Sequence, residues 1–365
     1  IINNITDKIH FLSSTKMGRM QRLIVIVLMC MMTAALSSCT SNRHDTSAIV
    51  ENIQVDLNHL DIDSVPLSML ADSVSLLALE ATEESIIGRI SDVKCTSKGI
   101  VIADNKSNAV YLYDYCGDFI RKIGSCGQGP GEYLNMHGID ATDSCIFIYD
   151  IVSESVNRYD YDGHYQGRDR IGSFDDFKVL DGGRRYLAAS FNMADSSGVY
   201  LINPTPKYSK TKLLGRRDPV DINHSWEFYS YGDTVNVMSS AFENNLYRFQ
   251  SDSLVKILEL DATPEPSGLE IERWTRPDAQ NHYLRTTYLN FPDYYIAYYS
   301  RYPDLRIIIV DRVKATVTVT SDIYNDFTEE EYSKTRGVFN GMPIFYIQGD
   351  DEDSNPRLMF LHLKK

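Results

Sequence analysis

Few residues in this chain combine a reactive side chain with a spacing that chemistry requires. His137, His224 and His282 carry imidazoles that could bind a metal or exchange protons, but they share no motif. The chain contains neither an HExxH zinc motif nor a GxSxG nucleophile motif. We therefore predict no catalytic residue, no metal site and no cofactor, and we keep the three histidines as ligand-binding candidates.

A second candidate is the loop Gly127–Tyr133, which contains three glycines and a proline. Glycine lacks a Cβ atom, so this backbone can adopt positive φ and aim N–H groups at an anion. A carboxylate in the loop could also accept hydrogen bonds from a sugar. The alternative is a fixed connection between two parts of the fold. The candidate ligand-binding residues are Gly127, Gln128, Gly129, Glu132 and Tyr133.

Acidic and aromatic residues give weaker signals. Asp104, Asp150 and Asp140 could line the mouth of a channel and hold a cation, but such residues more often cap turns. Aromatic residues could stack on sugars or contact a partner, although packing inside strands is the commoner role. The aromatic clusters are Tyr294, Tyr295, Tyr298 and Tyr299, and Trp226, Phe228, Tyr229 and Tyr231.

The first forty residues have the layout of an export signal. Lys16, Arg19 and Arg22 precede an apolar run from residue 23 to 35, which is too short to span a bilayer. The sequence Leu-Ser-Ser-Cys that follows resembles the bacterial lipobox, in which the cysteine, here Cys39, receives the lipid. We predict a signal region over residues 1–38 with its natural start at Met17, a lipidated Cys39, and a tether over residues 39–73.

Composition narrows the partners of the rest of the chain. A hydrophobic fraction of 43% permits a substantial core. The net charge of -14 repels phosphate backbones, so we expect no nucleic-acid partner and membrane contact only through the lipid. Pairing of the remaining cysteines stays open, because their spacing forms no CxxC motif. These are Cys95, Cys116, Cys126 and Cys145.

Two segments of the chain overlay at a constant offset. Residues 101–104 match 147–150, residues 113–115 match 159–161, and Gly117 matches Gly163, all 46 residues apart. Repeats of 40–50 residues containing four short strands are typical of β-propeller blades. Further repeats follow over residues 177–215, 226–260, 283–320 and 339–365. We therefore predict an all-β, six-bladed propeller of four-stranded antiparallel blades over residues 74–365.

The last repeat lacks one strand, whereas Val74–Leu79 is an apolar strand ahead of the first repeat. We predict that this N-terminal strand completes the last blade and closes the ring, which leaves no open edges. Two stretches depart from the repeat, Ala262–Asn290 and Thr328–Arg336. We predict that both are inserted loops with short helices, beginning near Leu269 and Thr328, where partner contacts could lie.

The blade pattern resembles the six-bladed β-propeller lipoproteins of Bacteroides-type bacteria, which are related to NHL-repeat proteins. The residues that carry the resemblance are Leu79-Glu80, Ile87–Ile90, Tyr113-Asp114, Gly117, Phe119, Ile123-Gly124 and the loop Gly127–Tyr133. The resemblance covers residue 74 to the end and is thin after Tyr200. It implies a fold and an envelope location but no reaction.

These observations support one leading function and two alternatives. We expect a monomeric, non-catalytic outer-membrane lipoprotein, on the periplasmic or cell-surface side, whose loops bind a glycan or an envelope protein. By strand counting, Gly127–Tyr133 lies where the innermost strands begin, near the central channel. Related propeller lyases use channel-facing histidines, so the first alternative is a lyase or hydrolase in which His137, His224 and His282 hold a metal. The second alternative is a structural scaffold.

Overall fold

The computed structural model describes residues 50–190, 198–205, 207–215, 228–238, 244–264, 281–301, 303–349 and 354–364. Met17, Cys39, His224, Trp226 and the helix expected from Leu269 lie outside the described residues. Within these ranges, no helix combines the length and apolar character needed to cross a bilayer.

Residues 50–365 form one compact unit of six antiparallel sheets, numbered here as blades 1 to 6 in chain order. Blade 1 consists of β4 (Ile90–Thr96), β5 (Gly99–Asp104), β6 (Ala109–Tyr113) and β7 (Phe119–Lys122). Blade 2 consists of β10 (Met136–Ala141), β11 (Ile146–Asp150), β12 (Ser155–Tyr159) and β13 (Tyr165–Arg170). Blade 3 consists of β14 (Asp176–Leu180), β15 (Arg185–Ser190), β16 (Gly198–Asn203) and β17 (Ser209–Gly215).

The second half of the ring repeats this pattern. Blade 4 consists of β18 (Phe228–Tyr231), β19 (Thr234–Met238), β20 (Asn245–Gln250) and β21 (Ser253–Thr263). Blade 5 consists of β22 (Leu284–Asn290), β23 (Tyr294–Arg301), β24 (Asp304–Asp311) and β25 (Thr316–Thr320). Blade 6 consists of β27 (Ser333–Phe339), β28 (Met342–Ile347), β29 (Arg357–Leu363) and β3 (Ala71–Ala78).

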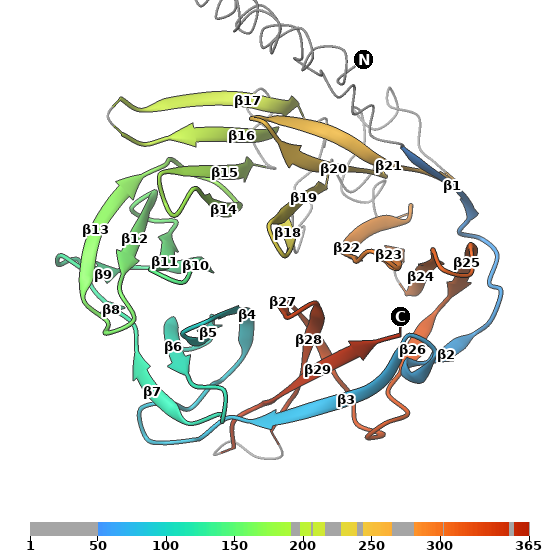
Figure 1. The fold of residues 1–365 in the computed structure, drawn as a ribbon, viewed down its shortest axis with the longest axis horizontal. Helices are drawn as coiled ribbons and strands as arrows, with labels where there is room; N and C mark the ends of the chain where they lie inside the picture. Colours follow the sequence, from blue (N-terminus) through green and yellow to red (C-terminus); the bar gives the residue numbers. More distant parts are fainter. Residues whose placement is uncertain are drawn as a thin grey trace, which may run out of the picture. The chain divides into compact units, whose positions relative to one another are not determined.

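The blades are arranged in a ring, with the first strand of each blade nearest the centre (Figure 1). Neighbouring inner strands contact one another around this ring, from β27 through β4, β10, β14 and β18 to β22. The six-bladed propeller predicted from the repeats is therefore confirmed. The last repeat begins six residues earlier than expected, at Ser333 instead of Phe339.

The offset of 46 residues reflects equivalent hairpins in blades 1 and 2. The carboxylates of Asp114 and Asp160 each accept two backbone N–H bonds from the turn that follows, at 2.7 to 3.0 Å. In the first turn, Gly117 adopts φ +89°, and a Cβ atom there would lie 2.0 Å from the carbonyl oxygen of Ala78. The turn requires glycine, because any side chain would collide with the strand of blade 6.

The ring is closed by the N-terminal strand, as predicted. The strand β3 pairs antiparallel with β29, and Val74 lies opposite Leu361 in this register. The observed bounds, Ala71–Ala78, include most of the expected segment Val74–Leu79. Blade 6 therefore combines strands from the two ends of the described chain.

The residues ahead of β3 differ from the tether expected over residues 39–73. The strand β1 (Glu51–Asp56) pairs parallel with β21 as a fifth strand of blade 4. The strand β2 (Ser64–Pro66) pairs parallel with β26 (Asp322–Tyr324), which follows blade 5. A single 3-10 turn, η1 (Leu67–Met69), leads into β3. We call residues 51–78 the strap, because they contact three successive blades.

The strap is held by burial of an alternating apolar pattern. Ile53, Val55 and Leu57 are buried, whereas the residues between them are exposed. Alternation of this kind is the pattern of a half-buried strand. The tether expected over residues 39–73 therefore extends too far, because the compact unit begins at Val50.

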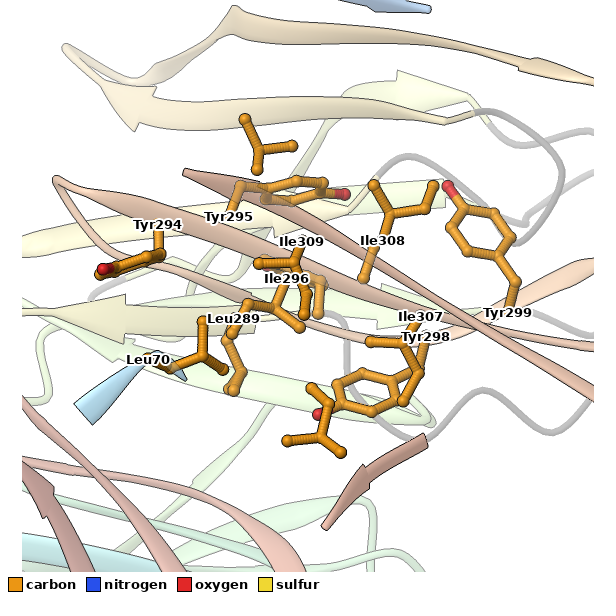
Figure 2. Packing of buried hydrophobic residues seen from close by; sticks show 14 of the residues in the cluster. Leu70, Leu289, Tyr294, Tyr295, Ile296, Tyr298, Tyr299, Ile307, Ile308 and Ile309 are labelled. Atoms are coloured by element: carbon orange, nitrogen blue, oxygen red, sulfur yellow. The ribbon is translucent and has the colours of Figure 1, made fainter. Parts of the chain in front are cut away.

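The core consists of hydrophobic clusters packed largely between neighbouring blades. The largest cluster joins blades 4, 5 and 6 to the strap and contains the tyrosine-rich strand β23. Figure 2 shows Tyr294, Tyr295, Tyr298 and Tyr299 among the isoleucines of β24. All four tyrosines are buried, so the packing role is confirmed for this aromatic cluster.

The helix expected from Thr328 is wrong. Residues 326–328 form a turn, and β27 already begins at Ser333. The carboxamide oxygen of Asn325 accepts the N–H groups of Phe327 and Thr328, both at 3.2 Å. Glu329 then adopts φ +60°, which an α-helix does not allow. The side chain of Asn325 thus supplies the capping expected from Thr328.

The four cysteines within the described residues are free. Cys95 and Cys145 are half-buried, while Cys116 and Cys126 are exposed. Burial raises the pKa of the Cys95 thiol to about 12, and the neighbouring Lys94 opposes this shift. Cys95 therefore remains protonated and unreactive at neutral pH.

Candidate functional site

The strand order gives the ring two distinct faces. Each blade has four alternating strands, so the chain leaves an outer strand on the face where the next inner strand begins. We call this the crossover face, because the connections between blades lie there. The opposite face, which carries the turn after each inner strand, is called the hairpin face.

The loop Gly127–Tyr133 lies on the crossover face but not at the channel. It belongs to the connection from the outer strand β7 to the inner strand β10. The short strand β8 (Ser125–Cys126) precedes it, and its last two residues form β9 (Glu132–Tyr133), which pairs parallel with β8. Figure 1 places β8 and β9 at the periphery, beside β13. The expected position at the channel rim is therefore wrong.

Side chains of blade 2 hold the loop in this outer position. The Tyr159 hydroxyl donates to the carbonyl oxygen of Gly131 at 3.1 Å. Asn157 and Arg168 donate to the carbonyl oxygen of Glu132, at 3.0 and 2.9 Å. Backbone carbonyls that a surface loop would leave to water are thus bonded to the neighbouring blade.

The loop also occupies its own polar groups. The carboxylate of Glu132 accepts the N–H of Gly129 at 2.7 Å, and a Cβ atom on Gly127 would lie 2.1 Å from the same oxygen. Gly131 adopts φ +77°, which confirms the expected glycine at positive φ. Tyr133 is fully buried. Ligand binding by this loop stays a prediction, and the exposed residues of the loop are Gln128 and Pro130.

The described histidines are not brought together. His137 is exposed at the start of β10, where its Nε2 atom lies 2.9 Å from the carbonyl oxygen of Asp175. His282 is half-buried, two residues before the start of β22 in blade 5. In the described part of the chain, only Asp160, Asp162 and His164 lie close enough to share a metal ion. The structure thus adds no support for a histidine metal centre.

The aspartates at strand ends cap turns. Asp104 accepts the N–H groups of Gly88 and Arg89, at 2.7 and 3.0 Å. Asp150 accepts the equivalent groups of Leu134 and Asn135, at 3.2 and 3.1 Å. Each carboxylate therefore ties an inter-blade connection to a hairpin of the next blade, which confirms the capping role.

The channel contains a cavity of about 340 Å³ on the hairpin face. Its walls come from the ends of inner strands and from hairpin turns, and two lysines line it. The Nζ atom of Lys94 lies 2.8 Å from Asp92, and that of Lys178 lies 2.8 Å from Asp140. Because each buried ammonium has its own carboxylate, the cavity presents little net charge to a ligand.

A larger pocket lies on the crossover face, between blades 5 and 6. This blade 5–6 pocket has a volume of about 600 Å³. Tyr298 and Ile307 of blade 5 form one wall, and the connection from β26 to β27 forms the rest. Its polar lining is mostly acidic, with five carboxylates and one lysine. These residues are Asp322, Asp326, Glu329, Glu330, Glu331 and Lys334.

Asn325 and Tyr332 fix the shape of the connecting segment. The Asn325 amide donates to the carbonyl oxygen of Glu330 at 3.1 Å, in addition to the bonds that form the turn. The Tyr332 hydroxyl donates to the carbonyl oxygen of Ile323 at 2.7 Å, and Arg357 pairs with Glu330. The segment therefore keeps an open shape through side-chain contacts, although it forms no regular element.

Several polar groups of the pocket have no partner among the described residues. No described group donates to the carboxylates of Asp322, Glu329 or Glu331, in contrast to Asp326, which accepts the N–H of Ser68 at 2.9 Å. Lys334 is half-buried, with its ammonium 3.7 Å from the centre of the Tyr298 ring. Burial lowers the pKa of Lys334 to about 8, and the Asp322 carboxylate opposes this shift.

The sequence predicts partner contacts in the segment that forms this pocket, but it does not identify the residues on which the pocket depends. The segment Thr328–Arg336 was expected to carry partner contacts, whereas Tyr298 and Lys334 were not identified. The acidic run Glu329–Glu331 predicts a helix start, and the structure contains no helix there. The available signal for Lys334 was its place close behind an acidic and aromatic segment. The burial of Lys334 depends on Tyr298 of blade 5, which lies about 36 residues away in the sequence.

Comparison with known proteins supports this architecture. A family model described as "Domain of unknown function (DUF4934)" matches residues 50–361. A protein of Bacteroides fragilis NCTC 9343 assigned as exported has a similar crystal structure, with TM-score 0.67 and 17% identity over 86% of this chain and 100% of that one. A duf4221 family member from Bacteroides vulgatus ATCC 8482 has TM-score 0.53 and 10% identity over 80% and 99%. No curated protein matches the chain.

Proposed function

We propose that this chain, which belongs to the DUF4934 family, is a lipid-anchored protein of the cell envelope that binds a glycan in the blade 5–6 pocket. The export signal and Cys39 support the location at the outer membrane and the anchor. The binding function rests on one observation, namely a pocket in which aromatic rings lie beside five carboxylates, three of which accept no hydrogen bond from a described residue.

The chemistry of this pocket matches that of a sugar. Tyr324 is 46% exposed, so its ring is available to stack on the apolar face of a pyranose. The carboxylates of Asp322, Glu329 and Glu331 are acceptors only, and sugar hydroxyls are donors that can satisfy them. A volume of about 600 Å³ lies within the range of small-molecule sites.

The acidic lining favours neutral or amine-bearing sugars over anionic ones. Five carboxylates line the pocket, and Arg357 neutralises only Glu330 among them. A sulfated or uronic-acid glycan would place further negative charge beside Glu329 and Glu331. We therefore expect binding to neutral or N-deacetylated glycans, with an affinity that falls as acidic sugars are introduced.

A glycan array probed with the purified full chain tests the binding function. On the best ligand, we expect Tyr324→Ala to weaken binding about tenfold and Glu331→Gln about fivefold, the usual effects of losing one stacking or one hydrogen-bonding group. Neither variant should change the melting temperature. The matched controls are Tyr165→Ala and Glu132→Gln, which lie at the other crossover. Equal binding by pocket and control variants, or no bound glycan, contradicts the proposal.

The anchor is tested separately. Replacing Cys39 by Ala should move the protein from the membrane fraction to the soluble fraction, because a diacylated cysteine adds two acyl chains at about 0.8 kcal/mol per buried methylene. Fractionation of cells that express each variant measures this. A Cys39→Ala protein that stays with the membranes after a salt wash would mean that something other than the lipid retains it.

A further inference from the structure

Lys334 has an unusual position for a lysine. It lies near the start of β27, the inner strand of blade 6, and lines the blade 5–6 pocket. Its ammonium lies over the ring of Tyr298, a buried residue of blade 5, at 3.7 Å. No described carboxylate pairs with it and no described oxygen accepts a hydrogen bond from it.

This environment makes the amine reactive. Burial lowers the pKa of Lys334 to about 8, whereas an ordinary lysine titrates near 10.4. At pH 7.5 a larger share of the Lys334 amines is therefore neutral than of an exposed lysine. The neutral amine is the nucleophile, and desolvation of a lysine favours this form.

We propose that Lys334 binds a carbonyl-bearing ligand, such as the open-chain form of a reducing sugar, as a reversible imine in the blade 5–6 pocket. The neutral nitrogen adds to the carbonyl carbon, and the proton lost by nitrogen is transferred to the carbonyl oxygen, which gives a carbinolamine. A pocket carboxylate then takes the remaining nitrogen proton and passes it to the departing hydroxyl, water leaves, and the C=N bond forms. Hydrolysis reverses these steps, so no oxidant or reductant is required.

The carboxylates of the pocket suit this step. Asp322 and Glu331 line the same cavity as Lys334 and carry no hydrogen bond from a described residue. Each is therefore available to move the proton that dehydration of the carbinolamine requires. The proposal rests on the proposed glycan site. It adds that this site would hold the carbonyl-bearing end of the ligand.

Lys210 provides a matched control within the same chain. Its ammonium lies 3.9 Å from the centre of the Tyr200 ring, and burial lowers its pKa as well. It differs in lying exposed on the outer strand β17 of blade 3, at none of the pockets described above. Stacking of a lysine on a tyrosine is thus common to both residues, whereas the acidic pocket belongs to Lys334.

Reductive trapping tests the proposal. The purified full chain is incubated with glyceraldehyde and sodium cyanoborohydride at pH 7.5, and labelled peptides are quantified by mass spectrometry. We expect Lys334 to be labelled at least tenfold faster than Lys210 and than the exposed Lys98, with a rate that rises with pH to a midpoint near 8. Labelling of Lys334 no faster than Lys210 overturns the proposal, and this comparison requires no variant.

A second measurement separates this proposal from the glycan site. Binding of the best array ligand is compared with binding of its reduced alditol, which has no carbonyl group. Selective labelling of Lys334 together with weaker alditol binding supports both proposals. Equal binding of the two forms without labelling keeps the glycan site and rejects the imine, while labelling without any bound glycan keeps the imine and rejects the glycan site.

Discussion

Two connections between blades use opposite means to cross the same face of the ring. In Gly127–Tyr133, glycines bring the backbone against blade 2, and the carboxylate of Glu132 bonds to the N–H of Gly129. In residues 325–332, the side chain of Asn325 holds the turn. Of the acids that follow, Glu329 and Glu331 accept no hydrogen bond from a described residue and line a pocket of about 600 Å³. A loop rich in glycine is therefore closed on itself, while a loop organised by one buried amide is open to a ligand.

The sharpest test of this contrast is Gly131→Val. A valine would have to adopt φ +77°, and its Cβ atom would lie 2.9 Å from the Cβ atom of Tyr165. We expect the free energy of unfolding to fall by on the order of 3 kcal/mol, measured by urea denaturation, with glycan affinity unchanged. Gly129→Val is the control, because Gly129 does not have positive φ and a Cβ there meets only the movable carboxylate of Glu132. It should cost less than about 1 kcal/mol. Equal losses would mean that the loop is not held by Gly131.

Asn325→Ala tests the other connection. Asn325 is 6% exposed and bonds three groups of the turn, so its loss should lower the free energy of unfolding by about 1–2 kcal/mol. Unlike Gly131→Val, this variant should also weaken glycan binding, because the acidic segment loses its fixed shape. A stability loss with full glycan affinity would show that the pocket does not depend on this turn.

The pH dependence of stability should distinguish Lys334. Its folded pKa of about 8 lies below the unfolded value of 10.5, so the unfolded chain binds more protons between these two values. Stability should therefore rise as pH increases through this window. We expect the stability of wild type relative to Lys334→Met to increase measurably from pH 7.5 to 9.5, by up to about 1 kcal/mol after allowance for solvent screening. A difference that is constant with pH would contradict the lowered pKa.

The smallest effect is expected from Glu132→Gln. The side chain keeps its shape, and its remaining carbonyl oxygen can still accept the N–H of Gly129. Unfolding free energy should change by less than about 0.5 kcal/mol, and glycan affinity should not change. Weaker glycan binding by this variant, with stability preserved, would transfer the ligand site to Gly127–Tyr133.

The fold could be predicted because the same turn chemistry recurs. Asp114 and Asp160 cap equivalent hairpins, and the spacing between them follows from four short strands per blade. The closing strand was visible as an apolar segment without a repeat. The sequence does not predict the part of the strap ahead of β3. The strands β1 and β2 pair parallel with strands that are distant in sequence, and no local turn joins the paired strands.

The candidate site was harder to predict, because its properties arise from tertiary contacts. Gly127–Tyr133 has a distinctive composition, but its backbone carbonyl groups accept hydrogen bonds from side chains of blade 2. Lys334 looked ordinary, and only the neighbouring blade places Tyr298 beneath its ammonium. Composition alone does not distinguish a residue that has a partner from one that lacks it.

The strap also determines how the ring responds to mechanical load. A pull on the chain ahead of residue 50 acts first on β1, at the edge of blade 4. It must separate β1 from β21 and then β2 from β26 before any tension reaches β3, the strand that closes blade 6. The first two strands of the strap therefore separate from their partners before the force acts on blade 6. If the chain is tethered to a membrane at this end, force on the tether separates these two peripheral strand pairs while the ring of blades stays closed.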